Sequence, residues 1–451
     1  RKKTHADQNK HERSKAMPDY KGMQYLRKKL VMKKSRVDLR YSYYEMKDLS
    51  LDKGITIPPE LRRQYLSTLG WCAKAVDAIA DRLVFREFES DNFEISEIFQ
   101  MNNPDVLFDS AFLSALISSC SFVYISPDTD GYPRLQIIDG GNATGIIDPI
   151  TNMLTEGYAV LKRDECDQPI LEAYFTAEFT EYHQKGVGAI RRDPNPAPYP
   201  LLVPIIYRPD AHRPFGHARI SRTCMYLQKF AKRTMERSDI AAEFYAIPQR
   251  YVLGMSPDAE RMDKWKATVS SLIQIDRDED GEKPVMGQFQ QMTMAPLSEQ
   301  LKMAAANFAG ETGLTTDDLG FVSDNPSSAE AIKASHETLR ITAKKAQRTF
   351  GSGLLNAGYL AACLRDRYPY ERRQFYLTTP KWEPIFDPDA SALTIIGDGV
   401  AKLNTAVPGY MGPDNIRDLT GIKPSEVMSY AGYDAGTSGS GRTQLPGEPE
   451  E

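Results

Sequence analysis

The segment from Asp276 to Gly281 has the residue types and spacing of a calcium-binding loop. It reads D-x-D-x-D-G, the first half of an EF-hand, in which carboxylate oxygens coordinate the ion and the glycine allows a sharp turn. The second half does not match, because position twelve, which needs a bidentate glutamate, is Gly287, and Pro284 interrupts the strand expected before it. We therefore predict a hairpin turn that joins two strands, with no bound metal or cofactor.

Other catalytic patterns are absent from the sequence. It contains no Gly-Lys-Ser/Thr, which a phosphate-cradling NTPase loop requires, and no G-x-S-x-G elbow of a hydrolase. His212 and His217 lie five residues apart in a predicted loop, without a nearby carboxylate or cysteine to complete a metal site. His336 falls on the apolar seam of a predicted helix, which indicates a packed or interfacial side chain. The sequence therefore predicts a protein that is not an enzyme.

The spacing of the cysteines and the length of the apolar stretches further limit the class of protein to which the chain can belong. The five cysteines lie dozens of residues apart without a C-x-x-C pair, so we predict reduced core residues and neither a disulfide framework nor a zinc cluster. The longest apolar stretch, Ala111 to Ile125, has about 15 residues, fewer than the roughly 20 that cross a bilayer. The basic, polar start has no apolar signal region. We predict no membrane span and no secretion.

Charge is distributed unevenly along the chain. The net charge is −5, but the first 36 residues hold 13 Lys/Arg against three acidic residues, so they carry +10 and the remainder −15. A basic arm of this kind either contacts nucleic acid or an acidic protein surface, or is a solvated, disordered tail. The sequence leaves both interpretations open.

The first half of the chain predicts an α+β fold. At 451 residues the chain exceeds the size of one hydrophobic core, so two or more packed regions are expected. Residues 17–88 are predicted to be mainly helical, with one helix running from Pro58-Pro59 to Phe88, and a further helix spans Pro104 to Ser118. Short alternating runs with turn clusters over residues 121–208 predict an antiparallel meander.

Two further helices bracket a small α/β insertion. One runs from about Ala218 to Ala246, where Pro248 disfavours further helix, and the other from about Pro296 to Gly313. About 50 residues of strand, short helix and strand-turn-strand separate them. The first helix has an apolar stripe and a basic one, which could equally be a solvated face, formed by Arg222, Lys229, Arg233 and Arg237.

The longest helical pattern begins at Asn325-Pro326, with Ser327 and Glu330 as a capping-box pair, and its apolar seam continues to Leu364. Glycines 351, 353 and 358 interrupt the pattern and predict a kink. A strand in "QFYLTTPKWEP" and helices in "DPDASALTIIGDGVAKL" and "GPDNIRDLTGI" follow. The chain closes in a Gly/Ser/Pro-rich segment that predicts disorder.

The stretch "LTTDDLGFVSDNPSSAEAIKASHETLRITAKKAQRTFG" (314–351) resembles the portal, or head-to-tail connector, proteins of long-tailed double-stranded DNA phages. Similar family-typical strings are "AAEFYAIPQRYVLG" (241–254), "WCAKAVDAIADRLVFREF" (71–88) and "KWEPIFDPDA" (381–390). The resemblance implies a portal-type α+β fold. Its parts would be a basic arm (1–16), wing (17–216), stem helices (217–246 and 296–313), clip (247–295), tunnel loop (314–325), kinked wing helix with return strand (326–386), crown (387–433) and disordered tail (434–451).

The resemblance also implies a function and partners. Portal subunits form a ring, typically of twelve, at one capsid vertex of the virion, after assembly in the host cytoplasm. Double-stranded DNA passes through the ring during packaging by a separate terminase and again during ejection. The expected partners are copies of the chain, DNA, the terminase large subunit, the head–tail adaptor, and the major capsid and scaffold proteins. The docking candidates in the clip are Asp278, Glu279, Asp280, Gly281, Glu282 and Lys283.

A DNA conduit should contact DNA without holding it, since several cationic phosphate contacts give strong, salt-dependent binding. The acidic body of this chain fits that requirement. Carboxylates of the tunnel loop would repel phosphates while sparse basic residues steady the duplex. The tunnel candidates are therefore Asp317, Asp318 and Asp324, together with the four basic residues Arg222, Lys229, Arg233 and Arg237.

Two other functions stay open. One is a metal-dependent DNA-processing enzyme, whose carboxylates would come from the segment Asp276 to Gly281. The other is a capsid-associated protein that coats DNA through its basic arm.

Overall fold

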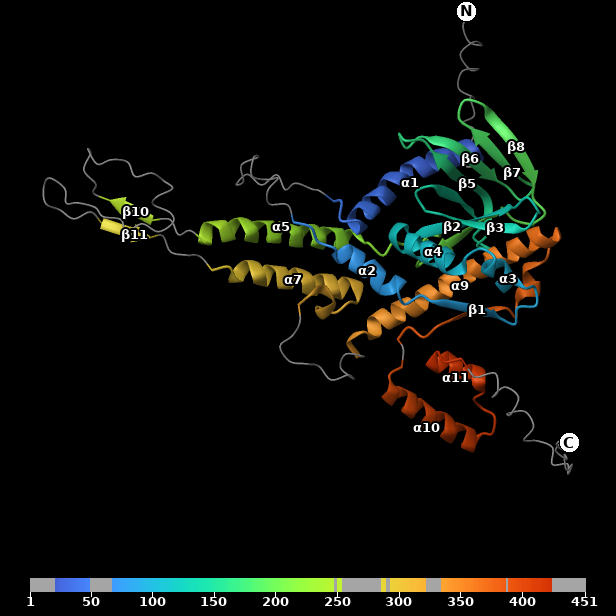
Figure 1. Cartoon of the computed structure of the whole chain (residues 1–451). Helices are drawn as coiled ribbons and strands as arrows, with labels where there is room; N and C mark the ends of the chain where they lie inside the picture. Colours follow the sequence, from blue (N-terminus) through green and yellow to red (C-terminus); the bar gives the residue numbers. More distant parts are fainter. Residues whose placement is uncertain are drawn as a thin grey trace, which may run out of the picture. The chain divides into compact units, whose positions relative to one another are not determined.

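The structure is a computed structural model that describes residues 21–48, 67–246, 250–253, 285–288, 293–321, 334–386 and 388–423. The chain divides into two compact units. Unit 1 comprises Arg1–Leu83 and Glu87–Lys381, and unit 2 comprises Val84–Arg86 and Trp382–Glu451. Helices and antiparallel sheets both occur in unit 1, which agrees with the predicted α+β class (Figure 1).

Two antiparallel sheets form the centre of unit 1. Strands β3 (Pro133–Ile138), β2 (Cys120–Pro127) and β9 (Leu202–Ile206) make the first, in that order. The second is a meander of β4 (Ala143–Ile147), β5 (Leu154–Arg163), β6 (Pro169–Phe175), β7 (Phe179–Gln184) and β8 (Gly188–Pro194). Side chains of both sheets meet in one core that includes Phe122, Tyr124, Leu154, Phe175 and Leu202. The predicted meander is therefore present, but it divides into two packed sheets.

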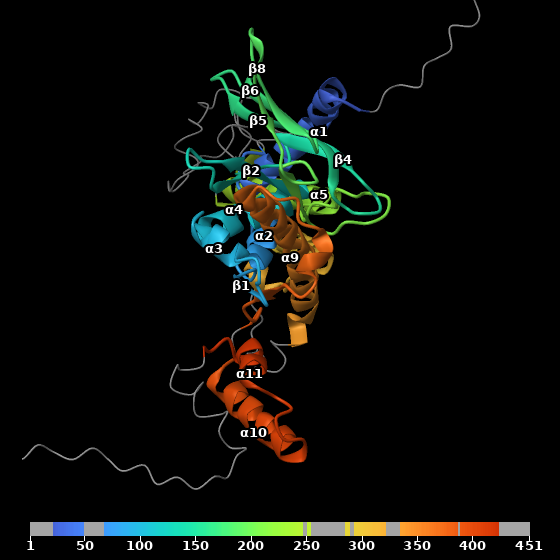
Figure 2. The same ribbon diagram turned by 90° about the vertical axis from the view of Figure 1, so that its right-hand side faces the viewer.

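Helices cover these sheets on both sides. Helix α1 (Met23–Tyr44) places Leu26 and Leu30 against Tyr158 and Val160 of β5. Helices α4 (Pro104–Ser118) and α9 (Glu337–Asp366) pack near β2 and β9 and are joined by stacked rings of Phe112 and Phe350, whose centroids are 5.1 Å apart. The short helices α2 (Trp71–Ala80) and α3 (Ile95–Gln100) complete this layer (Figure 2).

Two helices extend from this body as a hairpin and lie side by side (Figure 1). They are α5 (Arg222–Ala246) and α7 (Ala295–Thr312). Helix α5 begins four residues later than predicted because Ser221 caps it, its Oγ accepting a hydrogen bond from the backbone N–H of Cys224 at 3.1 Å. Strands β10 (Arg250–Leu253) and β11 (Val285–Gln288) pair antiparallel between the two helices in sequence.

One prediction about the limits of a helix is wrong. The helix expected to reach Phe88 ends at Ala80, and β1 (Phe85–Glu89) is a strand, because pairing with β12 (Thr379–Trp382) overrides the local helical pattern. Helix α9 runs uninterrupted through its glycines. A Cβ on Gly353 would lie 2.7 Å from Cδ1 of Ile205, and one on Gly358 would lie 2.5 Å from Cγ2 of Ile95. These glycines therefore permit close packing rather than a break, while residues 325–333, the predicted cap, lie outside the described residues.

Unit 2 contains the two predicted C-terminal helices, α10 (Ala390–Ala406) and α11 (Pro413–Thr420). Asp389 caps α10 by accepting a hydrogen bond from the N–H of Ala392 at 2.7 Å. The amide of Asn404 bonds to both the N–H and the carbonyl of Met411, which fixes the turn between the helices. Among the described residues, no helix has the length and hydropathy needed to cross a membrane.

Candidate functional site

The stripe of basic residues predicted on α5 lies away from the packed side of the hairpin. Arg222, Lys229 and Arg237 are exposed, and Arg233 is half-buried with its guanidinium 5.8 Å from the ring centroid of Phe230. Of the predicted apolar stripe, Cys224, Leu227 and Ala231 of α5 are buried, as is Ile220 just before the helix, whereas Ala241 is half-buried. The four basic residues thus follow one side of a long helix whose other side is fixed by packing.

Buried polar side chains anchor the base of the hairpin to the body. Arg219 donates from Nε to the carbonyl of Ala75 in α2 at 3.1 Å, and from its other end to the carbonyl of Thr312, the last residue of α7. The side chain of Gln228 accepts from the N–H of Cys72 at 2.7 Å. Since buried polar groups are costly unless they are bonded, these contacts fix the direction in which the hairpin leaves the body.

A second anchor joins α5 to the chain just after α1. The Nζ of Lys232 donates to the backbone carbonyl of Asp48 at 2.8 Å and lies 3.3 Å from its Oδ1. The side chains of Lys232 and Asp48 are only 8% and 4% exposed. This is a buried ion pair, and loss of either partner would leave the other charge uncompensated.

The predicted tunnel loop is described up to residue 321, and its two described acidic residues have different environments. Asp318 is half-buried, and its Oδ2 accepts from the N–H and the hydroxyl of Thr315, each at 2.9 Å. Nδ1 of His336, the N-cap of α9, lies 3.8 Å from the same oxygen. Asp317 is exposed, and Asp324 lies outside the described residues. Asp318 therefore holds the loop together, and Asp317 is the carboxylate that faces solvent.

The docking candidates of the predicted clip, Asp278 to Lys283, lie outside the described residues, as does the partial calcium-loop match. What is described there is the pairing of β10 with β11, from Arg250 opposite Gln288 to Leu253 opposite Val285. The strand that would precede the predicted hairpin turn also lies outside the described residues, so that hairpin stays a prediction.

A basic face of α1 was missed in the sequence. Lys29, Lys33, Arg36 and Arg40 recur at steps of four, three and four, so they share one face of the helix. Lys29 and Lys33 lie 5.2 and 5.6 Å from the ring centroid of Phe215, in the loop before α5. The helical spacing was a usable signal, but Lys29, Lys33 and Arg36 were counted only as part of the basic first 36 residues, and Arg40 was not considered.

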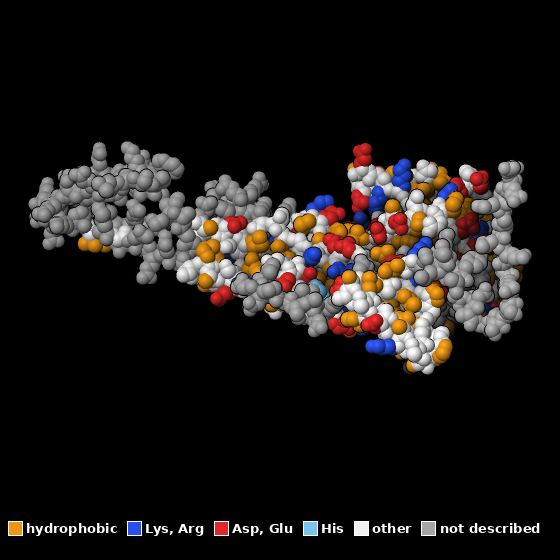
Figure 3. Space-filling model, turned by 60° about the horizontal axis from the view of Figure 1, so that its bottom comes forward, with side chains coloured by type: hydrophobic (Ala, Val, Ile, Leu, Met, Phe, Trp, Pro, Cys, Tyr) orange, Lys and Arg blue, Asp and Glu red, His pale blue; other side chains and the backbone are white. Residues whose placement is uncertain are grey.

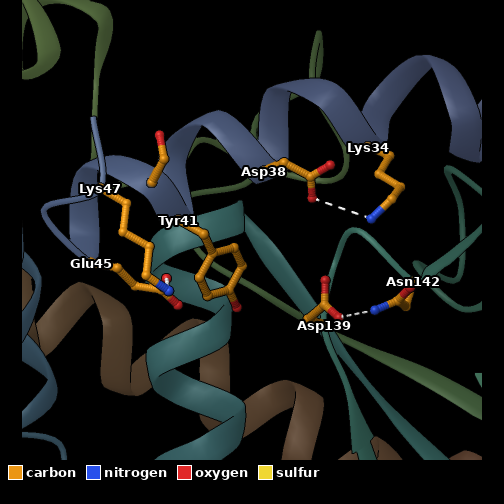
Figure 4. Close-up of a pocket in the computed structure, with 8 residues that line it drawn as sticks. Lys34, Asp38, Tyr41, Glu45, Lys47, Asp139 and Asn142 are labelled. Atoms are coloured by element: carbon orange, nitrogen blue, oxygen red, sulfur yellow. Dashed lines mark hydrogen bonds and ion pairs between the residues drawn. The ribbon is translucent and has the colours of Figure 1, made fainter. Parts of the chain in front are cut away.

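The other side of α1 borders a shallow hollow of about 460 Å³. Figure 4 shows Lys34 directed toward Asp38, at 3.4 Å, and Asp139 bonded to the amide of Asn142. Burial raises the pKa of Tyr41, which also lines the hollow, to about 12. Neutral tyrosine and neutralised charges give this hollow no group prepared for nucleophilic or acid–base chemistry at neutral pH.

Two predictions about single residues need correction. His217 does have a carboxylate partner, since its Nε2 lies 2.5 Å from Oδ2 of Asp210, a contact made possible by the turn at Gly216. Cys166 is exposed, whereas the other four cysteines are buried as predicted. Within the described ranges, His, Cys, Asp and Glu form no group of three or more that could hold a metal ion.

Comparison with known proteins places the chain in a family. Residues 24–384 match the family described as "Phage portal protein, SPP1 Gp6-like". The chain belongs to this portal family. The portal protein of Mycobacterium phage L5 is 26% identical over 336 residues, which cover 69% of this chain and 67% of that relative. The portal protein of Mycobacterium phage D29 is 25% identical over 356 residues, which cover 71% and 70%.

Solved structures also align with this portal chain. A chain from "Virion of native gene transfer agent (GTA) particle" aligns with a TM-score of 0.43 and 13% identity, covering 85% of this chain and 99% of that one. A chain from "Neck of empty GTA particle computed with C6 symmetry" gives a TM-score of 0.46 and 14% identity, with 84% and 98% covered. The family match confirms the resemblance stated from the sequence, and the portal family is a structural, non-enzymatic phage component.

Proposed function

We propose that this portal chain assembles into a ring of about twelve subunits at one vertex of a phage capsid. The ring is the channel through which double-stranded DNA enters during packaging and leaves during ejection. The observation that carries this proposal is the family match, which extends from α1 through the hairpin and α9 to residue 384. The chain functions in the virion, after assembly in the host cytoplasm.

The charge distribution supports a conduit that does not retain DNA. Twelve copies at −5 each give a ring of about −60, which repels phosphates on average. On the face that Figure 3 shows, Lys and Arg side chains are interspersed with Asp and Glu and form no continuous basic track over the described residues. In this proposal Asp317, Asp318 and Asp324 form part of the channel lining, and Arg222, Lys229, Arg233 and Arg237 provide sparse contacts with the duplex.

In this proposal each segment of the chain forms a different part of the portal. Helices α5 and α7 form the stem, anchored at the base by Arg219 and Lys232. Residues 247–295 form the clip, which docks the terminase large subunit and later the head–tail adaptor through residues 278–283. Residues 17–216 and 326–386 form the wing, and residues 387–433 the crown. The major capsid and scaffold proteins contact the assembled ring.

Electron microscopy of the purified full-length chain, with mass measurement, tests the proposal. Rings of about twelve subunits with a central channel are expected. A monomer or dimer at every salt and protein concentration would contradict it. A variant that lacks residues 1–16 should still form rings, whereas a protein that coats DNA through its basic arm would lose DNA retention with that deletion.

A further inference from the structure

Six cations gather where α1, the loop before α5 and the first turn of α5 meet. Helix α1 contributes its basic face of Lys29, Lys33, Arg36 and Arg40, and the loop and α5 contribute Arg213 and Arg222. The pKa of Arg40 is lowered, first by burial and then by the charges of Arg36, Arg213 and Arg222, so each of these three side chains lies near Arg40. We call these four arginines the arginine cluster.

The arginine cluster lacks carboxylate partners within the described part of the chain. None of its four guanidinium groups forms a salt bridge there, and the Nε of Arg40 is buried without a hydrogen-bond partner. Asp210, a carboxylate in the same loop as Arg213, is occupied by His217 and by backbone N–H groups. Crowded like charges repel, and burial strengthens that repulsion. The part of the subunit that the structure describes does not offset this positive charge.

A matching excess of negative charge lies on α2 and α4. Asp105 and Asp109 are exposed one turn apart on α4, and Asp81 follows the last turn of α2. The pKa of Asp109 is raised, first by burial and then by the charges of Asp105 and Asp81. These three carboxylates, the aspartate cluster, have no salt bridge with another described residue. Exposed Val106 lies between two of them and adds apolar contact area.

Among the elements that carry the two clusters, Figure 2 shows α4 to one side of unit 1 and α1 and α5 to the other, with α2 between them. A closed ring of identical subunits uses heterologous contacts, so each subunit must present two different surfaces that complement each other. Oppositely charged, unpaired clusters on two sides of one body have this property.

We propose that the arginine cluster of one subunit docks on the aspartate cluster of the next copy of this chain, and so selects the neighbour and fixes its register in the ring. This inference rests on the proposed ring. DNA is a less suitable occupant of the arginine cluster, because several arginine–phosphate contacts would retain a duplex that has to move. In this inference Arg222 therefore contacts the neighbouring subunit, and Lys229, Arg233 and Arg237 remain the basic contacts with the duplex. DNA would also leave the aspartate cluster unexplained.

Paired charge reversals test this contact. One variant carries Arg36→Glu and Arg213→Glu, a second carries Asp105→Lys and Asp109→Lys, and a third combines all four changes. All four positions are exposed. Ring fraction is measured by mass photometry and electron microscopy at near-physiological salt, with circular dichroism to confirm folding. We expect each double variant to lose at least about tenfold in ring fraction and the combined variant to regain rings.

A control variant with Lys28→Glu and Lys345→Glu has the same change in net charge as the arginine variant, also at exposed positions. It should form rings like the wild type. If wild type forms rings and both double variants do too, the proposed contact is wrong. It is also wrong if the combined variant stays dissociated, or if the arginine variant forms rings but loses only DNA retention. Failure of wild type itself to form rings would instead contradict the proposed function.

Discussion

Replacing Lys232 by methionine should destabilise the fold strongly, because it leaves a buried carboxylate without its partner. Nζ of Lys232 lies 3.3 Å from Oδ1 of Asp48, and both side chains are less than a tenth exposed. At an effective dielectric constant of 20, Coulomb's law gives about 5 kcal/mol of attraction at this distance. Breaking a buried ion pair by removing one partner typically costs about 3–5 kcal/mol. We expect a loss of that size in the free energy of unfolding.

Urea unfolding followed by tryptophan fluorescence, to which the buried Trp71 contributes, measures this loss, with all variants at one protein concentration so that assembly contributes equally. Lys229→Met is the matched control, since Lys229 is exposed one turn earlier on the same helix, and it should change stability by less than about 0.5 kcal/mol. Adding Asp48→Asn to Lys232→Met removes the stranded charge and should restore more than half of the loss. If Lys232→Met behaves like Lys229→Met, the pair does not anchor the hairpin and the reasoning fails.

Two further predictions concern packing and reactivity. Gly358→Ala should destabilise the fold by about 1–2 kcal/mol in thermal unfolding, because crowding against the buried Ile95 outweighs the gain of about 1 kcal/mol in helix propensity. Gly310→Ala, with open space around the new Cβ, is the control and should be neutral or stabilising in the same assay. Thiol labelling of the native protein at pH 8 should modify Cys166 alone. Burial protects the other four thiols and raises the pKa of Cys72, Cys224 and Cys363. More than one fast-reacting thiol, or labelling that survives Cys166→Ser, would show that the core is more accessible than described.

Patterns confined to one element were predictable from the sequence. Helix α4 has the predicted limits, and α7 lies within one residue of its prediction, because apolar spacing, prolines and the glycine after α7 act locally. The apolar stripe of α5 is buried at Cys224, Leu227 and Ala231, as its spacing indicated. The role of the glycines in α9 was not predictable, because it depends on the Ile205 and Ile95 side chains that the fold brings against the helix.

The candidate site was less predictable because its groups meet through tertiary contacts. The six residues between Asp210 and His217 are closed by a turn at Gly216, whose φ of 71° requires glycine in a loop with few other signals. Asp318 was expected to face DNA, yet its bonds to Thr315 use its carboxylate to order the loop. The arginine cluster combines α1 with residues more than 170 positions away, and no local pattern connects them.

The guanidinium of Arg219 makes two hydrogen bonds at the base of the hairpin formed by α5 and α7. Its guanidinium reaches the last residue of α7, and Ser221 bonds to Glu311 at 2.8 Å, so the start of α5 and the end of α7 are held together. For a loop whose ends are fixed, each doubling of length costs only about 0.6 kcal/mol of closure entropy. The distal part of the hairpin is therefore the place where residues can be inserted, deleted or exchanged at little cost to the body. Portal proteins with different docking partners could differ there while keeping the same base.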